Sequence, residues 1–181
     1  MSFKKKIILA SNQLLASIQA TMEQVDWERL IELEDLLQQR GRTYVTGAGR
    51  SGLVARSFGM RLMQAGFEAF IPGETITPAI GEHDLLIAVS CTGETGYTNY
   101  LAGKAKNFGA TVIVITATMD SSLCRLSDQT ILIPVQEENI VLKATVFEHV
   151  TSLCLDALFN LFLEKFKIDS VEFRKRHANL E

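Results

Sequence analysis

The stretch Asp84–Thr95, DLLIAVSCTGET, decides the fold of this chain. Its first part, Leu85–Val89, is an unbroken apolar run, typical in length and residue type of a strand buried on both faces. The run stops at Ser90, and the rest of the stretch consists of small, hydroxyl-bearing or glycine residues with one glutamate. A helical pattern covers residues 97–108. The stretch therefore predicts a buried strand, a polar turn and a helix in succession.

The polar turn has the features of an anion site. Free backbone N–H groups point outward from the first turn of a helix, and the helix dipole favours negative charge there. Hydroxyl groups at three positions add neutral donors without the bulk of a basic side chain. The turn predicts a phosphate cradle for a small molecule, and we assign to it Ser90, Cys91, Thr92, Gly93, Glu94 and Thr95.

A second turn, GAGRSG at Gly47–Gly52, follows a predicted strand at Thr43–Thr46. It fits the GxGxxG pattern of dinucleotide-binding proteins, and Glu74 falls about twenty residues further on, where a ribose-binding acid would lie. A dehydrogenase of this length would lack room for a substrate domain. Two polar turns at the carboxyl ends of neighbouring strands fit one compact phosphate better, with Gly49 and Ser51 as further binding residues.

The composition sets limits on the class of protein. The chain has 181 residues, 47% hydrophobic and 22% charged, as is ordinary for one soluble domain. Its net charge of −3 argues against a nucleic-acid partner. The start MSFKKKIILA has too short an apolar part for a signal peptide, and no run approaches the roughly 18 apolar residues of a membrane span. The three cysteines are far apart with no CxxC, which predicts a reducing cytoplasm and no zinc site.

Short apolar strands alternate with helical patterns along the rest of the chain. Residues 4–39 predict helix with a break near Asp26, which can cap the second segment. The five predicted strands are Thr43–Thr46, Glu68–Ile71, Leu85–Val89, Thr111–Thr116 and Thr130–Pro134. Further helices are predicted over residues 53–64, 97–108, 120–126 and 146–166, with residues 136–143 as a loop.

This alternation predicts an α/β fold: a single doubly wound, flavodoxin-like domain with a five-stranded parallel sheet, preceded by an N-terminal helical segment. We expect one domain over residues 1–181. It comprises N-terminal helices over 1–40, a sheet core with the phosphate turns over 41–135, and a C-terminal helix and tail over 145–181. The leading helices carry more apolar positions than one covering layer needs, so packing against another subunit and an ordinary covering role are both open.

The two turns on such a domain resemble the sugar isomerase (SIS) domain. Within that family, GAGRSGLVARSFGMRLMQAGF, the GETITPAI loop and the closing RHANLE are similar to the 6-phospho-3-hexuloisomerases. The resemblance implies interconversion of D-arabino-hex-3-ulose 6-phosphate and fructose 6-phosphate, in the ribulose monophosphate route that fixes or detoxifies formaldehyde. It also implies a homotetramer. Another phosphosugar isomerase, acting on an arabinose or heptulose phosphate, and a non-catalytic sugar-phosphate sensor are the alternatives.

Moving a carbonyl from C3 to C2 needs one base and a donor for the developing oxyanion, with no metal and no redox cofactor. Glu148 is the candidate base. Thr145-x-x-Glu148 before an apolar run is also a capping box, so the residues alone leave capping and catalysis open. The resemblance favours catalysis, because the family places its proton acceptor at the glutamate of this Phe-Glu pair. His177, in the RHANLE tail, is the candidate second acid or base, from a neighbouring subunit if the tail docks there.

The remaining polar candidates have ordinary alternatives. Arg50 could approach the phosphate or face solvent, and Arg61 is expected to form a structural salt bridge. Cys91 at a helix start could have a lowered pKa and a redox role, or simply fill space as a small residue. His83 is expected on the loop surface, and His149 is expected to have a packing or surface role. An apolar stripe is expected in the core or a subunit interface: Leu153, Ala157, Leu158, Leu161 and Phe162.

Overall fold

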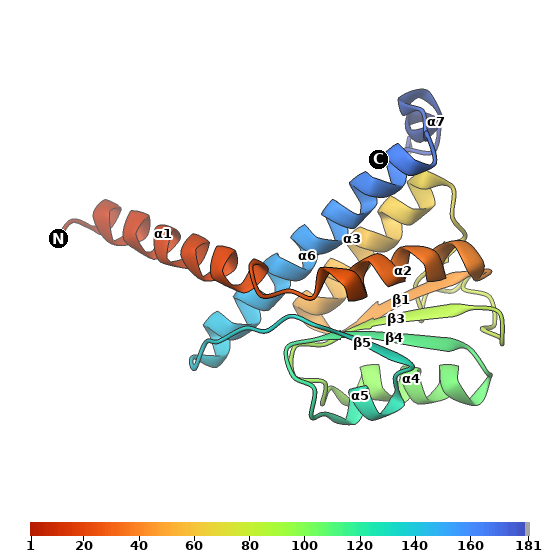
Figure 1. The fold of residues 1–181 in the computed structure, drawn as a ribbon, viewed down its shortest axis with the longest axis horizontal. Coiled ribbons are helices and arrows are strands. Elements are labelled where there is room, and N and C mark those ends of the chain that lie inside the picture. Colours follow the sequence, from red (N-terminus) through yellow and green to blue (C-terminus); the bar gives the residue numbers. More distant parts are fainter. Residues whose placement is uncertain (180–181) are drawn as a thin grey trace.

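The strand β3, Leu85–Val89, lies at the centre of a parallel sheet with the strand order β2-β1-β3-β4-β5 (Figure 1). The structure is a computed structural model that describes residues 1–179. The other strands are β1 (Thr43–Gly47), β2 (Ala69–Phe70), β4 (Thr111–Thr116) and β5 (Gln129–Leu132). All four pairings are parallel, so the predicted α/β class and strand number are confirmed.

Strand β3 is buried on both faces because its side chains alternate between two cores. Leu85, Ile87 and Val89 belong to the larger core. Leu86 and Ala88 point to the opposite face and pack in the smaller one. An unbroken apolar run is what this position in a doubly covered sheet requires.

Helices cover both faces of the sheet. The larger core includes residues of α1 (Phe3–Met22), α2 (Trp27–Gln39), α3 (Gly49–Ala65) and α6 (Ile140–Lys165). On the other face lie α4 (Gly96–Asn107) and α5 (Ser122–Leu126) (Figure 1). As predicted, Asp26 caps α2, where its side chain accepts a hydrogen bond from Arg29 N.

Two helices begin earlier than the sequence predicted. Helix α3 begins at Gly49 instead of residue 53, so most of the GAGRSG motif forms the first turn of the helix. Helix α6 begins at Ile140, because the Asn139 side chain accepts hydrogen bonds from Val141 N (3.0 Å) and Leu142 N (3.1 Å). The loop predicted over residues 136–143 is thus half helical.

Helix α6 is long and apolar enough to meet the criteria for a membrane span, but 56% of its most apolar window is buried within this domain. Leu158 and Phe162 belong to the core, whereas Leu153, Ala157 and Leu161 of the same stripe are exposed. The stripe therefore divides between core and surface.

The two ends of the chain differ. The N-terminal half of α1 projects from the domain as an arm (Figure 1), and all of residues 1–13 are exposed. The C-terminal tail forms the short helix α7 (Ser170–Lys175) beside the C-terminal end of α3. Leu180 and Glu181, the last two residues of the RHANLE motif, lie outside the described residues.

Candidate active site

The two predicted turns leave the sheet side by side. Gly47 at the end of β1 is paired in register with Val89 at the end of β3. The chain passes from β1 to β2 on one side and from β3 to β4 on the other, so the strand order reverses between these two strands. In open α/β sheets, ligands bind outside the carboxyl ends of the strands at this reversal. The two turns therefore form one candidate site.

The first turn depends on close backbone approach. A Cβ atom on Gly47 would lie 2.8 Å from Val89 O and 2.9 Å from Gly52 N. One on Gly52 would lie 2.6 Å from Gly47 O. Only glycine fits at these two positions, and the start of α3 is thereby held against the ends of β1 and β3. The N-cap of α3, Ala48, has no side chain able to bond the first N–H groups, so these remain available to a ligand.

The second turn is built from hydroxyl groups. Ser90 Oγ accepts a hydrogen bond from Gly93 N (3.2 Å) and lies 3.3 Å from Thr95 Oγ1. Gly93 has φ +66°, and a Cβ there would lie 2.2 Å from Ser121 Oγ. Thr95 is the N-cap of α4 but makes no side-chain capping bond, and Thr92 is exposed. Neutral donors and unbonded helical N–H groups therefore gather here.

Two residues of this turn have roles of their own. The Glu94 carboxylate accepts a hydrogen bond from Ser122 N (2.7 Å), which lowers the pKa of Glu94 and directs its charge toward α5. Burial raises the pKa of the Cys91 thiol, which favours the space-filling alternative over a lowered pKa with a redox role. The reason is that desolvation of this half-buried side chain is the largest influence on the pKa of the thiol.

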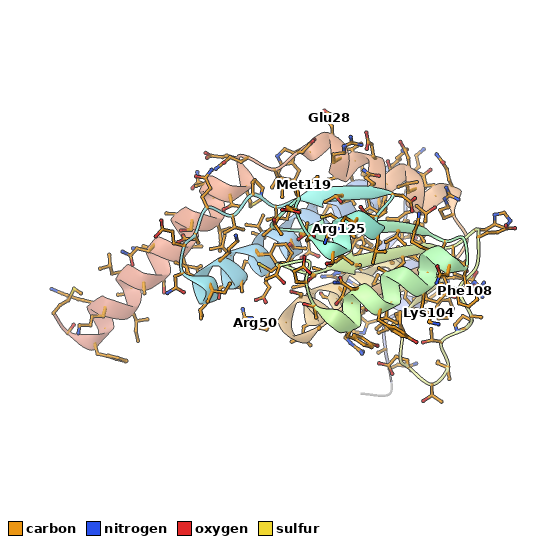
Figure 2. The ribbon with its side chains drawn as sticks, turned by 90° about the horizontal axis from the view of Figure 1, so that it is seen from below. Glu28, Arg50, Lys104, Phe108, Met119 and Arg125 are labelled. Carbon is orange, nitrogen blue, oxygen red and sulfur yellow. The ribbon has the colours of Figure 1, made fainter. Side chains whose placement is uncertain are left out.

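Glu148 lies in the interior of α6, in its third turn, and the capping interpretation is therefore wrong, because Asn139 caps this helix. The Glu148 side chain is 8% exposed and accepts a hydrogen bond from Arg50 Nε in a close ion pair. Arg50 is itself 64% exposed at the start of α3, where Figure 2 labels it. The Glu148 carboxylate is thus held beside the first turn, with its charge balanced from the solvent side.

Helix α6 also faces the second turn. Besides burial, two charges of α6 act on the Cys91 thiol: Lys143 lowers its pKa and Glu148 raises it. The Glu148 carboxylate therefore lies within electrostatic reach of Cys91 and in contact with Arg50. The buried Glu148 carboxylate thus acts on residues of both turns.

The three histidines are all exposed. His177 is exposed, and its neighbour Arg176 donates to Gln64 O (3.4 Å) near the C-terminal end of α3. Seventeen helical residues separate the ends of α3, which is roughly 25 Å. Within one chain, His177 is therefore not brought to Glu148. His149 and His83 are exposed.

A small cavity of about 50 Å³ adjoins the first turn. Its lining includes Gly47 and Gly52 of that turn, Tyr97 at the start of α4, and Arg56 of α3. Sequence reasoning missed Arg56 and Tyr97, since an exposed arginine or tyrosine on a helix carries no motif. A larger cavity of about 250 Å³ lies between α4 and the loop over residues 72–80. Neither a residue of the two turns nor Glu148 is among the residues that line it, although Pro72 lines both cavities.

The match to known proteins agrees with this geometry. The SIS domain family profile matches residues 36–161, which include both turns and Glu148. The chain belongs to the SIS domain family.

Individual members of the family are similar to this chain over most of its length. The 3-hexulose-6-phosphate isomerase of Mycobacterium gastri is 36% identical over 168 residues, covering 89% of this chain and 84% of the relative. That of Bacillus subtilis is 34% identical, covering 93% and 96%. A crystal structure of a Methanococcus jannaschii protein, for which the function of a 3-hexulose-6-phosphate isomerase was inferred, has a TM-score of 0.84 and 31% identity over 98% of this chain and 99% of that chain. The resemblance to the 6-phospho-3-hexuloisomerases, the same enzymes under another name, is confirmed.

Proposed function

We propose that this chain is a sugar-phosphate isomerase that interconverts D-arabino-hex-3-ulose 6-phosphate and D-fructose 6-phosphate. Relatives of that name at 34–36% identity over most of the chain support the reaction. The observation that carries the proposal is the buried Glu148 carboxylate beside two turns with unbonded helical N–H groups.

In this proposal, the turns hold the phosphoryl group and leave the carbonyl end of the sugar facing Glu148. Gly49 and the turn over residues 90–95 supply backbone N–H groups, while Ser51, Ser90 and Thr95 supply hydroxyl donors. Glu94 takes part through its backbone, because its carboxylate is bonded to Ser122 N. Anchoring the phosphate fixes the position of C2 and C3, which lowers the entropic part of the barrier.

Glu148 then moves the proton. The carboxylate takes the proton from C2 of the 3-hexulose phosphate, so that the C2–H electron pair forms the C2=C3 bond of an enediolate and the π pair of the C3 carbonyl moves onto O3. A proton passes from O2 to O3, and the carboxylate then returns its proton to C3 as the C2 carbonyl of fructose 6-phosphate forms. Arg50 holds the carboxylate in place and is near enough to stabilise the developing oxyanion. These steps need neither a metal nor a redox cofactor.

Self-association completes the proposal. Large apolar side chains are exposed along α1, among them Phe3 (78%) and Leu15 (63%), and Leu161 of α6 is 54% exposed. Burying such surfaces against other copies favours an oligomer, which we propose is the homotetramer implied by the resemblance. His177 would then act only as a residue from a neighbouring copy. We place the enzyme in the cytoplasm, in the ribulose monophosphate route.

The test is a coupled assay of the purified chain. Hexulose phosphate is supplied as the 3-ketose, and fructose 6-phosphate is detected through glucose 6-phosphate and its dehydrogenase. Arabinose 5-phosphate and heptulose phosphates serve as alternative substrates. Formation of fructose 6-phosphate at a rate well above the rate at which the other sugar phosphates are isomerised supports the proposal. No turnover of any substrate, with sugar phosphate still bound, would favour the sensor alternative.

A further inference from the structure

The proposed mechanism leaves unused a second arginine of α3, six residues after Arg50. Arg56 lines the small cavity beside the first turn, together with Gly47, Gly52 and Tyr97. It is the one cation among the residues that line this cavity. Helical side chains lean toward the N-terminus of their helix, so the Arg56 guanidinium reaches back toward the start of α3.

Arg56 forms an ion pair with a carboxylate of the loop that follows β2. Arg56 Nη1 donates to Glu74 Oε1 at 2.7 Å, and both side chains are about half exposed (48% and 51%). An exposed pair of this kind adds little to stability and exchanges partners readily. The pair of Arg50 and Glu148 differs, because Glu148 is buried. If Arg50 moved away, a buried carboxylate would be left without a partner, which is costly.

The turn that carries Glu74 holds its shape without this ion pair. Thr77 Oγ1 donates to Ile71 O (2.6 Å), and Thr77 N donates to Glu74 O (3.0 Å). Tyr97 Oη, from the first turn of α4, donates to Pro72 O at 3.5 Å. The Glu74 side chain can therefore leave Arg56 while the backbone of the turn stays in place.

From these contacts we infer that Arg56 is a further ligand-binding residue, which binds the phosphoryl group of the sugar phosphate, and that Glu74 competes with the phosphate for it. The inference deepens the proposed function and rests on it for the nature of the ligand. A phosphate dianion offers two oxygens to a guanidinium and forms a stronger, bidentate pair than a half-exposed carboxylate does. Ligand binding then exchanges one partner of Arg56 for another.

The two members of the ion pair give opposite predictions. Arg56→Ala removes a ligand contact, and we expect the Kd of fructose 6-phosphate and of inorganic phosphate, measured by calorimetry, to rise about tenfold. Glu74→Gln removes the competitor, and we expect both Kd values to fall by roughly two- to fivefold, the fold-change that breaking an exposed pair allows. In the Arg56→Ala background, Glu74→Gln should bring no gain.

The control is Arg61→Ala, which removes another half-exposed arginine of the same helix, 3.9 Å from Asp156; it should leave both Kd values unchanged. If the pair were only structural, Arg56→Ala and Glu74→Gln would weaken binding in the same direction, which would overturn the inference, as would unchanged binding in Arg56→Ala. If the two variants change the Kd in opposite directions but the wild-type chain shows no turnover, the result would support the role of Arg56 and refute the isomerase activity. Failure of the wild-type chain to bind either probe would refute both.

Discussion

The two turns at the carboxyl ends of β1 and β3 are built in different ways. The first, Gly47–Gly52, is fixed by backbone contacts that exclude a side chain, and it is bordered by charged pairs. The second, Ser90–Thr95, is fixed by hydrogen bonds among hydroxyl groups and turns its one carboxylate away toward α5.

The difference assigns different tasks to the two turns. A turn lined with neutral donors binds a phosphoryl group without altering its charge, whereas a turn bordered by a buried carboxylate and its arginine can move a proton. We therefore expect loss of Glu148 to change turnover, crowding of the first turn to change stability, and loss of a phosphate donor in either turn or at Arg56 to change affinity.

The largest effect is expected at Glu148. We predict that Glu148→Gln lowers kcat by about a thousandfold, within the range usual for loss of a general base, because glutamine cannot accept the proton. The Kd of fructose 6-phosphate should stay within about tenfold of the wild-type value, since the phosphate contacts remain. Steady-state kinetics and calorimetry measure the two quantities. Unchanged kcat in a folded variant would remove Glu148 from the mechanism.

Gly47 tests the close approach in the first turn. We predict that Gly47→Ala lowers the free energy of unfolding by about 1–3 kcal/mol, because the new Cβ meets two backbone atoms that cannot move aside. Gly103→Ala in α4, where a Cβ meets nothing within 4 Å, is the matched control and should be neutral or stabilising. Denaturant unfolding of both variants gives the comparison. Equal effects in the two would show that the turn has room to spare.

Smaller effects are expected from loss of the hydroxyl groups of the second turn. Ser90→Ala and Thr95→Ala should each raise the Kd of fructose 6-phosphate and of inorganic phosphate by roughly three- to tenfold, as expected for one lost hydrogen bond. Ser11→Ala, which removes an exposed hydroxyl of α1, should change neither. Wild-type affinity in both turn variants would contradict the proposed cradle.

The smallest effect concerns Cys91. Because burial raises the pKa of its thiol, we expect alkylation by iodoacetamide at pH 7 to be slower than that of a free cysteine peptide. A raised pKa also means that the stability contributed by the protonated thiol is fully present below the unfolded-state pKa and is lost as the pH rises through the folded-state pKa. Mass spectrometry at a series of pH values resolves Cys91 from the other thiols. Faster alkylation than in the peptide would show that the helix dipole prevails.

Much of the fold could be predicted from local patterns. Leu85–Val89 and Thr111–Thr116 were predicted with the correct bounds, because an apolar run that ends in a turn marks a buried strand. The start of α6 could not be predicted in this way, because Asn139 lies in a polar stretch where several residues could cap a helix. The capping interpretation of Glu148 failed for this reason.

The candidate site was predicted only in part. Motifs placed both turns, because strand, turn and helix follow one another in the sequence. The partners of Arg50 and Arg56 could not be predicted, since Glu148 lies 98 residues from the one and Glu74 lies 18 from the other, and only the packing of α3 brings the pairs together. The place of His177 depends likewise on where α7 packs.

A crystal structure with fructose 6-phosphate bound tests the central claim most directly. We predict that the phosphoryl group lies within hydrogen-bond distance of Ser90, Thr95 and the first N–H groups of α3 and α4. We also predict that C2 and C3 lie beside the Glu148 carboxylate, within reach for proton transfer. A phosphoryl group bound away from both turns, or a sugar whose C2 and C3 face away from Glu148, would contradict it.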